Sequence, residues 1–164
     1  MNKIELKPFN DFKNDEFRQL FKKYFEEEEG IVLNPNTTVF DQMQQKANEG
    51  KEHAFIITKN SKIVAFILSR IYSLKNSGKF LFQNIGYIEE LYVLPEERNQ
   101  KFATKLICET YKYFAQNNIK RVILTTEEHN YNFYKKLGYK LDETYECANK
   151  LKVFAKDLEK KDLL

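Results

Sequence analysis

Ile88–Thr104, with the sequence IEELYVLPEERNQKFAT, predicts a strand, a tight turn and a helix in direct succession. The apolar run Ile85–Val93 is typical of a strand, and apolar residues recur at helical spacing over Phe102–Gln116. A helix that begins directly after a strand points several unpaired backbone N–H groups at one place. Such a place binds phosphate, because the free donors and the positive end of the helix dipole act together. The sequence therefore predicts a phosphorylated ligand at this turn, where Arg98 and Lys101 add positive charge.

Two segments of the chain together resemble the acetyl-CoA motifs of the GNAT superfamily of N-acetyltransferases. Leu91–Ala103 is similar to the family's Leu-x-Val-x-Pro, then Arg or Gln, two free positions, Gly, one free position, and Gly or Ala. Arg98 and Ala103 fit this pattern, but Lys101 stands where the family has its first Gly. Asn132–Tyr139, with the sequence NFYKKLGY, is similar to the family's Phe-Tyr-x-Lys-x-Gly-Phe. The pair of segments is much more specific than either segment alone.

Periodicity and turn signals place strands and helices along the whole chain. The strands are expected at Ile4–Leu6, Ala54–Thr58, Ile63–Tyr72, Ile85–Val93, Val122–Thr125, Tyr139–Leu141 and Leu151–Ala155. The helices are expected from Asn10 or Asp11 to about Glu29, from Thr37 or Thr38 to Asn48, over Phe102–Gln116, and around Phe133, Tyr134 and Leu137. These patterns alone establish an α/β or α+β class in one domain, residues 1–164. The resemblance implies a mixed, mostly antiparallel central sheet of six or seven strands flanked by about four helices, in the order β-α-α-β-β-β-α-β-α-β-β.

Turn and capping residues predict where several of these elements end. Pro8 is expected to close the first strand, and residues 59–61, Lys-Asn-Ser, to form a hairpin turn. Thr125 and Glu128 have the spacing of a capping box at the start of the last helix. Gly138 suits the C-terminal cap of the same helix.

The composition is that of a soluble globular protein with an unusually high aromatic content. The chain has 164 residues and a formal net charge of +3, with lysines and acids spread along its length, which argues against a nucleic-acid-binding surface. No run of 18 apolar residues predicts a membrane span, and the N-terminus lacks the apolar core of a signal peptide. A cytoplasmic location is therefore expected for the protein. Cys108 and Cys147 match no metal or redox spacing, so no metal is expected, and Cys108 is predicted to be a small core residue.

The resemblance implies how acetyl-CoA is held as the cosubstrate. Backbone groups of Leu91 and Val93 pair with the pantetheine arm, and the loop from Arg98 to Thr104 takes the pyrophosphate. A bulge near Leu91 frees a backbone N–H that polarises the acetyl carbonyl. The implied binding residues are Leu91, Tyr92, Val93, Arg98, Asn99, Gln100, Lys101, Phe102, Ala103, Thr104, Asn130 and Tyr134.

Tyr134 is the best single candidate for a catalytic side chain, because in the resemblance its hydroxyl protonates the CoA sulfur as it leaves. A phenol titrating near 10 is a suitable donor to a thiolate whose parent thiol titrates near 8.5. The alternative is that Tyr134 is one core aromatic among several in this helix, beside Tyr131 and Phe133.

The acceptor amine must lose a proton before it attacks, and a carboxylate on the central strand can accept that proton. Glu89 and Glu90 are the acids there, and adjacent strand residues face opposite sides, so at most one of them points at the acceptor. A bulge makes it unreadable from the sequence which of the two that is. A solvated or ion-paired role is the alternative for each. His53 and His129 are possible bases without supporting neighbours.

The acidic run Glu26–Glu29 ends the first long helix. In the implied fold, this part of the chain and the Leu74–Asn84 loop form the acceptor wall, where acids would attract a cationic amine such as a polyamine, an aminoglycoside or a lysine side chain. A solvated helix end is the alternative. The function expected is acetyl transfer to a primary amine of a small cationic molecule or peptide, in a monomer or homodimer. The competing hypothesis, supported by Lys101, is a CoA-binding sensor or interaction module without turnover.

Overall fold

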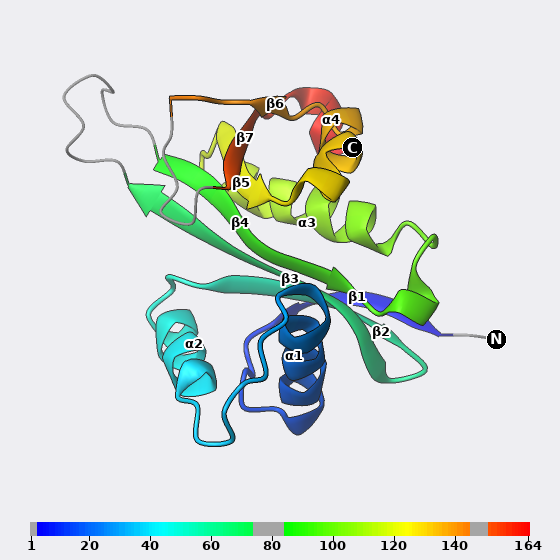
Figure 1. Cartoon of the computed structure of the whole chain (residues 1–164). Helices are drawn as coiled ribbons and strands as arrows, with labels where there is room; N and C mark the ends of the chain where they lie inside the picture. Colours follow the sequence, from blue (N-terminus) through cyan, green and yellow to red (C-terminus); the bar gives the residue numbers. More distant parts are fainter. Residues whose placement is uncertain (1–2, 74–83, 145–150) are drawn as a thin grey trace. The chain divides into compact units, whose positions relative to one another are not determined.

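Seven strands, counted over the described residues 3–73, 84–144 and 151–164 of this computed structural model, form a sheet in the order β1-β2-β3-β4-β5-β7-β6 (Figure 1). The strands are β1 (Ile4–Phe9), β2 (His53–Lys59), β3 (Lys62–Ser73), β4 (Asn84–Val93), β5 (Arg121–Thr126), β6 (Lys140–Leu141) and β7 (Lys152–Asp157). The helices are α1 (Asp15–Glu28), α2 (Val39–Asn48), α3 (Phe102–Gln116) and α4 (Tyr131–Lys136), with short 3-10 turns η1 (Pro95–Glu97), η2 (Glu128–Asn130) and η3 (Lys160–Leu163). The predicted order of strands and helices is confirmed.

The pairings described for the sheet are mostly antiparallel. β1 pairs antiparallel with β2, and β7 pairs antiparallel with both β5 and β6. β4 and β5 are parallel, with Gly86–Ile88 of β4 opposite Val122–Leu124 of β5. The mixed, mostly antiparallel sheet expected from the sequence is therefore confirmed.

The chain divides into two compact units. Unit 1 comprises residues 1–68 and 90–107, and unit 2 comprises residues 69–89 and 108–164. The predicted single domain, residues 1–164, stays a prediction.

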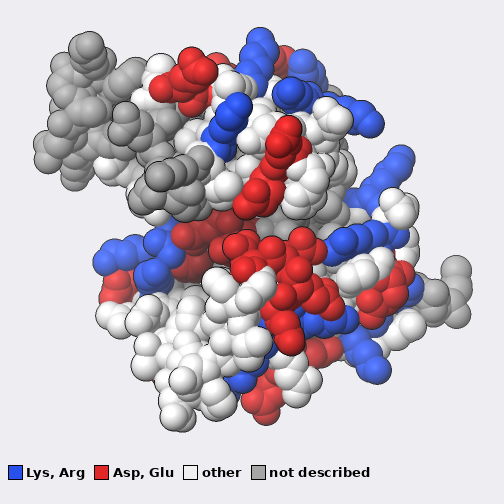
Figure 2. Space-filling view, viewed as in Figure 1, with Lys and Arg blue, Asp and Glu red and all other residues white. Residues whose placement is uncertain are grey.

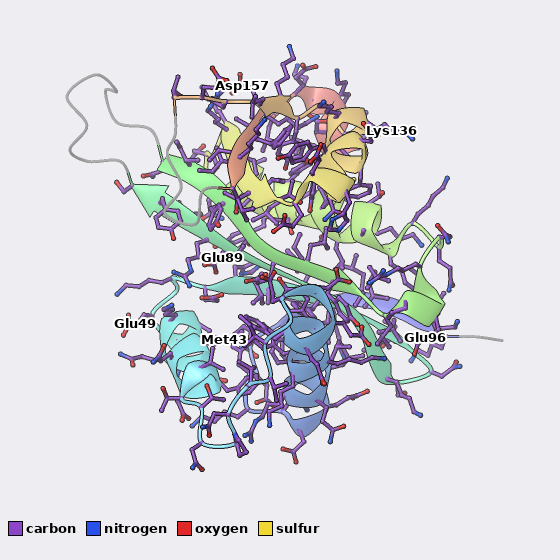
Figure 3. The ribbon with its side chains drawn as sticks, viewed as in Figure 1. Met43, Glu49, Glu89, Glu96, Lys136 and Asp157 are labelled. Carbon is purple, nitrogen blue, oxygen red and sulfur yellow. The ribbon has the colours of Figure 1, made fainter. Side chains whose placement is uncertain are left out.

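Unit 1 is built on aromatic packing between two helices and the strands that they cover. α1 and α2 lie on the same side of β2 and β3 (Figure 1). Phe17 and Phe21 of α1 pack against Phe66 of β3, with ring centroids 5.4 and 5.7 Å apart. Met43 of α2 joins this cluster and lies on the side of its helix that faces α1 (Figure 3). Burial of such rings supplies most of the stability of a helix on a sheet.

Unit 2 has its own core, in which α3 approaches β4 closely. A Cβ on Gly86 would lie 2.7 Å from Cε2 of Phe114, so the helix can pack here only because residue 86 is glycine. Tyr111 and Tyr139 are buried, and their hydroxyls satisfy each other at 2.9 Å. Burial raises the pKa of Tyr111, with the hydrogen bond to Tyr139 acting against that rise.

Three predicted element ends are wrong. α1 begins later than expected, because Asn14, and not Asn10 or Asp11, caps it by accepting the Phe17 N–H at 3.1 Å. β1 continues through Pro8 to Phe9, since an edge strand tolerates a residue without an N–H. No capping box forms at Thr125, which belongs to β5 and pairs with Val153 of β7.

Two other predicted turns are confirmed. Asn60 and Ser61 both have positive φ, 52° and 67°, as the two-residue turn between β2 and β3 requires. Gly138 has a φ of 90° at the end of α4, where the Tyr139 N–H donates to the Tyr134 carbonyl at 3.1 Å. Within the described residues, no helix is both long and apolar enough to cross a membrane.

Candidate functional site

The connection from β4 to α3 is fixed within unit 1 by polar contacts. The Leu94 N–H donates to the Val64 carbonyl of β3 at 3.0 Å. Lys59 of β2 forms an ion pair of 2.7 Å with Glu97, in which both side chains are largely buried. Gln100 donates to the same carboxylate at 2.7 Å, and the hydrogen bond from Lys59 and then that from Gln100 lower the pKa of Glu97. The turn is therefore held in one conformation.

Lys101 has the backbone conformation that explains why the family places Gly here. Its φ is +61°, in the left-handed region that favours glycine, and Asn99 has a φ of +63°. The Lys101 carbonyl accepts the Lys105 N–H at 3.0 Å, so Lys101 is the residue that precedes α3. The first N–H groups of the helix, starting at Phe102, then have no intrahelical partner. This turn fits a phosphate, because it offers free donors beside an exposed ammonium.

Arg98 is less available to a phosphate than the sequence suggested. Its Nε donates to the Val93 carbonyl at 3.1 Å, and its other nitrogen forms an ion pair of 2.7 Å with Glu28 of α1. The guanidinium carbon lies 5.9 Å from the ring centroid of Tyr92. The side chain thus ties α1 to β4, and part of its charge is offset by Glu28. A role for Arg98 toward pyrophosphate stays a prediction.

The end of β4 leaves backbone groups, rather than side chains, for a ligand. Tyr92 is buried, and its hydroxyl donates to Glu27 of α1 at 2.5 Å. Burial, followed by the hydrogen bond to Glu27, raises the pKa of Tyr92. Val93 is also buried, while Leu91 is half-buried. The described β4–β5 pairs end at Ile88, so Leu91 and Val93 lie beyond them, as a strand that pairs with a ligand would require.

Glu89 and Glu90 have different partners. Glu89 forms an ion pair of 2.8 Å with Arg70 of β3, and its position on β4 is labelled in Figure 3. Glu90 accepts a hydrogen bond from the Tyr24 hydroxyl of α1. Because Tyr92 two residues later also faces α1, Glu90 and Tyr92 share one face of β4. Glu89, one residue before Glu90, contacts β3 instead.

Tyr24 was not identified as a site residue from the sequence, where it was one aromatic in the stripe of the first helix. Its hydroxyl contacts both Glu90 and Glu29, the latter at 3.3 Å, and its ring lies 5.4 Å from that of Tyr92. Burial, and then the charge of Glu90, raise the pKa of Tyr24 well above its ordinary value. The available signal was helical spacing, which places Tyr24, Glu27 and Glu28 on neighbouring positions of one face.

The acidic run at the end of α1 is partly engaged in these contacts. Glu27, Glu28 and Glu29 contact Tyr92, Arg98 and Tyr24, respectively. Glu26 is exposed, as are Glu27, Glu28 and Glu29, and Figure 2 shows acidic side chains gathered on this face of the molecule. The run is therefore neither a fully solvated helix end nor a set of free carboxylates.

In unit 2, Tyr134 lies on α4 with a relative exposure of 8%. Its ring is edge-on to Tyr139, with centroids 5.7 Å apart, and close to Phe133 at 5.0 Å. Asn130 is half-buried and directly precedes the helix. Tyr134 is thus a well-packed aromatic residue. Its catalytic role stays a prediction.

The alternative bases differ in their surroundings. His53 is half-buried with its ring 4.9 Å from Phe55, and burial lowers the pKa of His53. His129 is exposed on η2. Cys108 is half-buried on α3, where burial raises its pKa, and Cys147 lies outside the described residues, as do residues 74–83 of the expected acceptor loop. Within the described ranges, no group of three or more His, Cys, Asp or Glu residues is placed to hold a metal ion.

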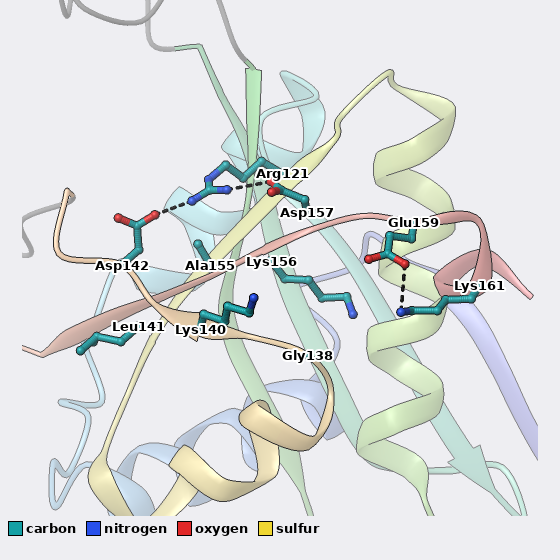
Figure 4. Close-up of a pocket in the computed structure, with 10 residues that line it drawn as sticks. All are labelled: Arg121, Gly138, Lys140, Leu141, Asp142, Ala155, Lys156, Asp157, Glu159 and Lys161. Carbon is teal, nitrogen blue, oxygen red and sulfur yellow. Dashed lines mark hydrogen bonds and ion pairs between the residues drawn. The ribbon is translucent and has the colours of Figure 1, made fainter.

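A cavity of about 510 Å³ in unit 2 is lined by charged side chains (Figure 4). Arg121 forms ion pairs with Asp142 and Asp157, the latter at 2.7 Å, and Lys161 pairs with Glu159 at 2.9 Å. Burial would raise the pKa of Asp142, but hydrogen bonds from Thr144 and Arg121 hold it below its ordinary value. These ion pairs offset most of the charge that lines the cavity.

The comparisons with known proteins agree with the strand–turn–helix geometry. Residues 14–139 match the model of the acetyltransferase (GNAT) family, which is more than half of the chain, so the chain belongs to this family. The PaiA N-acetyltransferase from Thermoplasma acidophilum in complex with coenzyme A is 13% identical, with a TM-score of 0.73, 95% of this chain and 99% of that chain being covered. No curated protein matches the chain.

Two further solved structures are similar. A predicted acetyltransferase from Clostridium acetobutylicum with acetyl-CoA is 19% identical, with a TM-score of 0.71, covering 90% of this chain and 96% of that one. NAA60 from Arabidopsis thaliana in complex with a bisubstrate analogue is 18% identical, with a TM-score of 0.70, covering 94% and 98%. At these identities the likeness shows the fold. Family membership makes the protein an N-acetyltransferase with acetyl-CoA as its cosubstrate.

Proposed function

We propose that this protein transfers the acetyl group of acetyl-CoA to a primary amine of a small cationic molecule or peptide, by direct attack in a ternary complex. The observation that carries the proposal is the acidic end of α1, where Glu27, Glu28 and Glu29 are held by Tyr92, Arg98 and Tyr24. Carboxylates held by a neutral hydroxyl, as Glu27 and Glu29 are, keep their charge and attract a cation, whereas the charge of Glu28 is offset by Arg98. A structural relative holds a bisubstrate analogue, which is the kind of ligand expected where both substrates bind together.

Acetyl-CoA is proposed to bind unit 1 along the end of β4 and the turn that follows. Backbone groups of Leu91 and Val93 take the pantetheine arm, and the N–H groups at the start of α3 take the pyrophosphate. The left-handed backbone at Lys101 supports this, because it leaves the turn open beside those donors. Arg98 contributes mainly by holding the turn in place, since its charge is shared with Glu28.

The chemistry requires a base for the amine and an acid for the thiolate. An alkylammonium titrates near 10.4, so freeing its lone pair at pH 7 costs about 4.6 kcal/mol. A carboxylate of β4, Glu89 or Glu90, is proposed to accept that proton. Tyr134 is proposed to protonate the sulfur as the C–S bond breaks.

Ligand-induced stabilisation tests the donor site. Saturating acetyl-CoA is expected to stabilise the protein by about 2.7 kcal/mol at a hundredfold excess over the dissociation constant. Differential scanning fluorimetry measures this as a rise in the melting temperature. Acetyl-pantetheine, which lacks the pyrophosphate, is the matched control and should give a much smaller rise. An unchanged melting curve at millimolar acetyl-CoA would contradict the proposed donor site.

A thiol-release assay then tests the acceptor class. Spermidine, an aminoglycoside and a lysine-containing peptide are the cationic probes, and aniline, which is uncharged at neutral pH, is the control. Release with a cationic probe but not with aniline is expected. Acetyl-CoA binding without release on any of these amines would instead support a module without turnover.

A further inference from the structure

The two neighbouring carboxylates of β4, Glu89 and Glu90, are bound to chemically different partners. Glu89 faces the Arg70 guanidinium at 2.8 Å, whereas Glu90 accepts from the Tyr24 hydroxyl. A guanidinium only donates hydrogen bonds, while a phenol hydroxyl both donates and accepts. The two acids therefore differ in how well they tolerate a proton.

A general base must exist in both its ionised and its protonated form during each turnover. When Glu89 takes up a proton, it loses an ion pair, and its new O–H finds no acceptor on Arg70. When Glu90 takes up a proton, the Tyr24 hydroxyl can rotate, and its oxygen can accept from the new acid. Glu90 thus keeps its partner in both states, and Glu89 does not.

We propose that Glu90 is the general base and that Tyr24 is its positioning residue. This inference rests on the proposed function and adds to it which carboxylate acts and what holds it. Glu90 takes one proton from the substrate ammonium and later releases it to solvent. The freed lone pair forms the C–N bond, the C–S bond breaks, and a second amine proton balances the protonation of the thiolate. The products are an acetamide, a free thiol and one proton.

The charged and hydroxyl groups of unit 1 around Glu90 determine how Tyr24 affects the protonation of Glu90. Glu29 lies 3.3 Å from the Tyr24 hydroxyl, and its negative charge favours the protonated form of Glu90. The Tyr24 hydroxyl has one proton to donate, and its closer contact is with Glu90. Tyr92 faces the same helix, but its hydroxyl is bound to Glu27, and Arg98 is bound to Glu28. Tyr24 therefore offsets the repulsion between Glu29 and Glu90.

The pH profile of kcat/KM tests this, with acetyl-CoA and spermidine as probes. Tyr24→Phe removes the hydroxyl, so Glu90 holds its proton to higher pH, and the acid limb should move up by about one unit. The loss of rate should be largest at pH values below the midpoint of that limb, and the affinity for acetyl-CoA should be unchanged. Glu29→Gln should move the limb in the opposite direction, which a merely structural role of Tyr24 would not predict.

Two further comparisons keep the inference open to contradiction. Tyr111→Phe removes a buried hydroxyl from unit 2 and controls for general destabilisation, so its acid limb should not move. Glu90→Gln should lower kcat by about 10²-fold or more and abolish the acid limb, whereas Glu89→Gln should retain an acid limb. An unmoved limb in Tyr24→Phe, or a limb that vanishes in Glu89→Gln, would overturn the inference alone. Absence of turnover in the unsubstituted protein would overturn the proposed function together with it.

Discussion

Lys101 has a backbone conformation that is energetically unfavourable for any residue with a side chain. A non-glycine residue at a φ of +61° is strained by about 1–2 kcal/mol relative to the right-handed region. Asn99 tolerates its own positive φ better, because its short polar side chain suits that region. The chain therefore keeps the geometry of a glycine turn without the glycine. Lys101 is exposed, and within the described residues its ammonium forms no ion pair, so it is available to a phosphate.

Two substitutions separate the backbone of Lys101 from its charge. Lys101→Ala keeps the strain and removes the ammonium, so it should weaken acetyl-CoA binding, and the difference should shrink as salt is added. Lys101→Gly also relieves the strain and should raise the free energy of unfolding by about 1 kcal/mol. Calorimetric titration at two salt concentrations and denaturant unfolding measure these effects. Binding by Lys101→Gly as tight as that of the unsubstituted protein would show that the lysine is tolerated rather than used.

Tyr134 permits a sharp test because its phenol can be changed without changing its packing. Tyr134→Phe removes one oxygen and keeps the ring that contacts Tyr139. A general acid contributes about 10²–10⁴-fold to a rate, so turnover should fall at least about tenfold, with water as a substitute donor. Acetyl-CoA affinity should be nearly unchanged, which marks an interaction made in the transition state.

Tyr131→Phe is the matched control for Tyr134→Phe, since it makes the same change on the same helix and its ring packs on Phe154. Its turnover should stay close to that of the unsubstituted protein. Full turnover in Tyr134→Phe, with chemistry shown to be rate-limiting, would make Tyr134 a core aromatic.

The elements show which sequence signals suffice and which do not. α3 spans Phe102–Gln116 as predicted, because one strong apolar period and a preceding turn define it. α1 was placed too early, since Asn10, Asp11 and Asn14 are all good caps and the choice depends on where Phe12 is buried. The ends of β1 and β5 depended on strand pairing, which local sequence does not contain. Element type was thus readable, and element ends required tertiary contacts.

Gly86 is a position where the packing of α3 on β4 tolerates little change. A Cβ would lie 2.7 Å from the ring of Phe114, which is itself buried. Gly86→Ala should therefore cost about 1–3 kcal/mol of stability by overpacking. Thermal or denaturant unfolding measures this loss.

A second substitution identifies the cause of that loss. Phe114→Leu shrinks the side chain that the new methyl group meets. In the Gly86→Ala background, Phe114→Leu should lower the free energy of unfolding much less than it does in the unsubstituted protein. The difference between the two losses is a measurable coupling energy. Additive losses would mean that the strain lies elsewhere.

For the molecule as a whole, the family could be predicted from two short segments, while the acceptor side could not. Leu91–Ala103 and Asn132–Tyr139 carry the chemistry that family members share, so residue identity alone is informative there. The partners of Glu90, Arg98 and Tyr92 are about 65 or more positions away in the chain, on α1. No local pattern joins residues at that separation, and only the folded chain brings them together.

The position of β1 in the strand order has a consequence for the behaviour of the protein at high concentration. An exposed strand edge is a template onto which another chain can add. β1 lies at one edge and carries charged Lys7 next to Pro8, which has no N–H to donate to an incoming strand. β6, at the other edge, is only two residues long. Both edges thus disfavour pairing with a strand of another molecule, which opposes aggregation through the edges of the sheet.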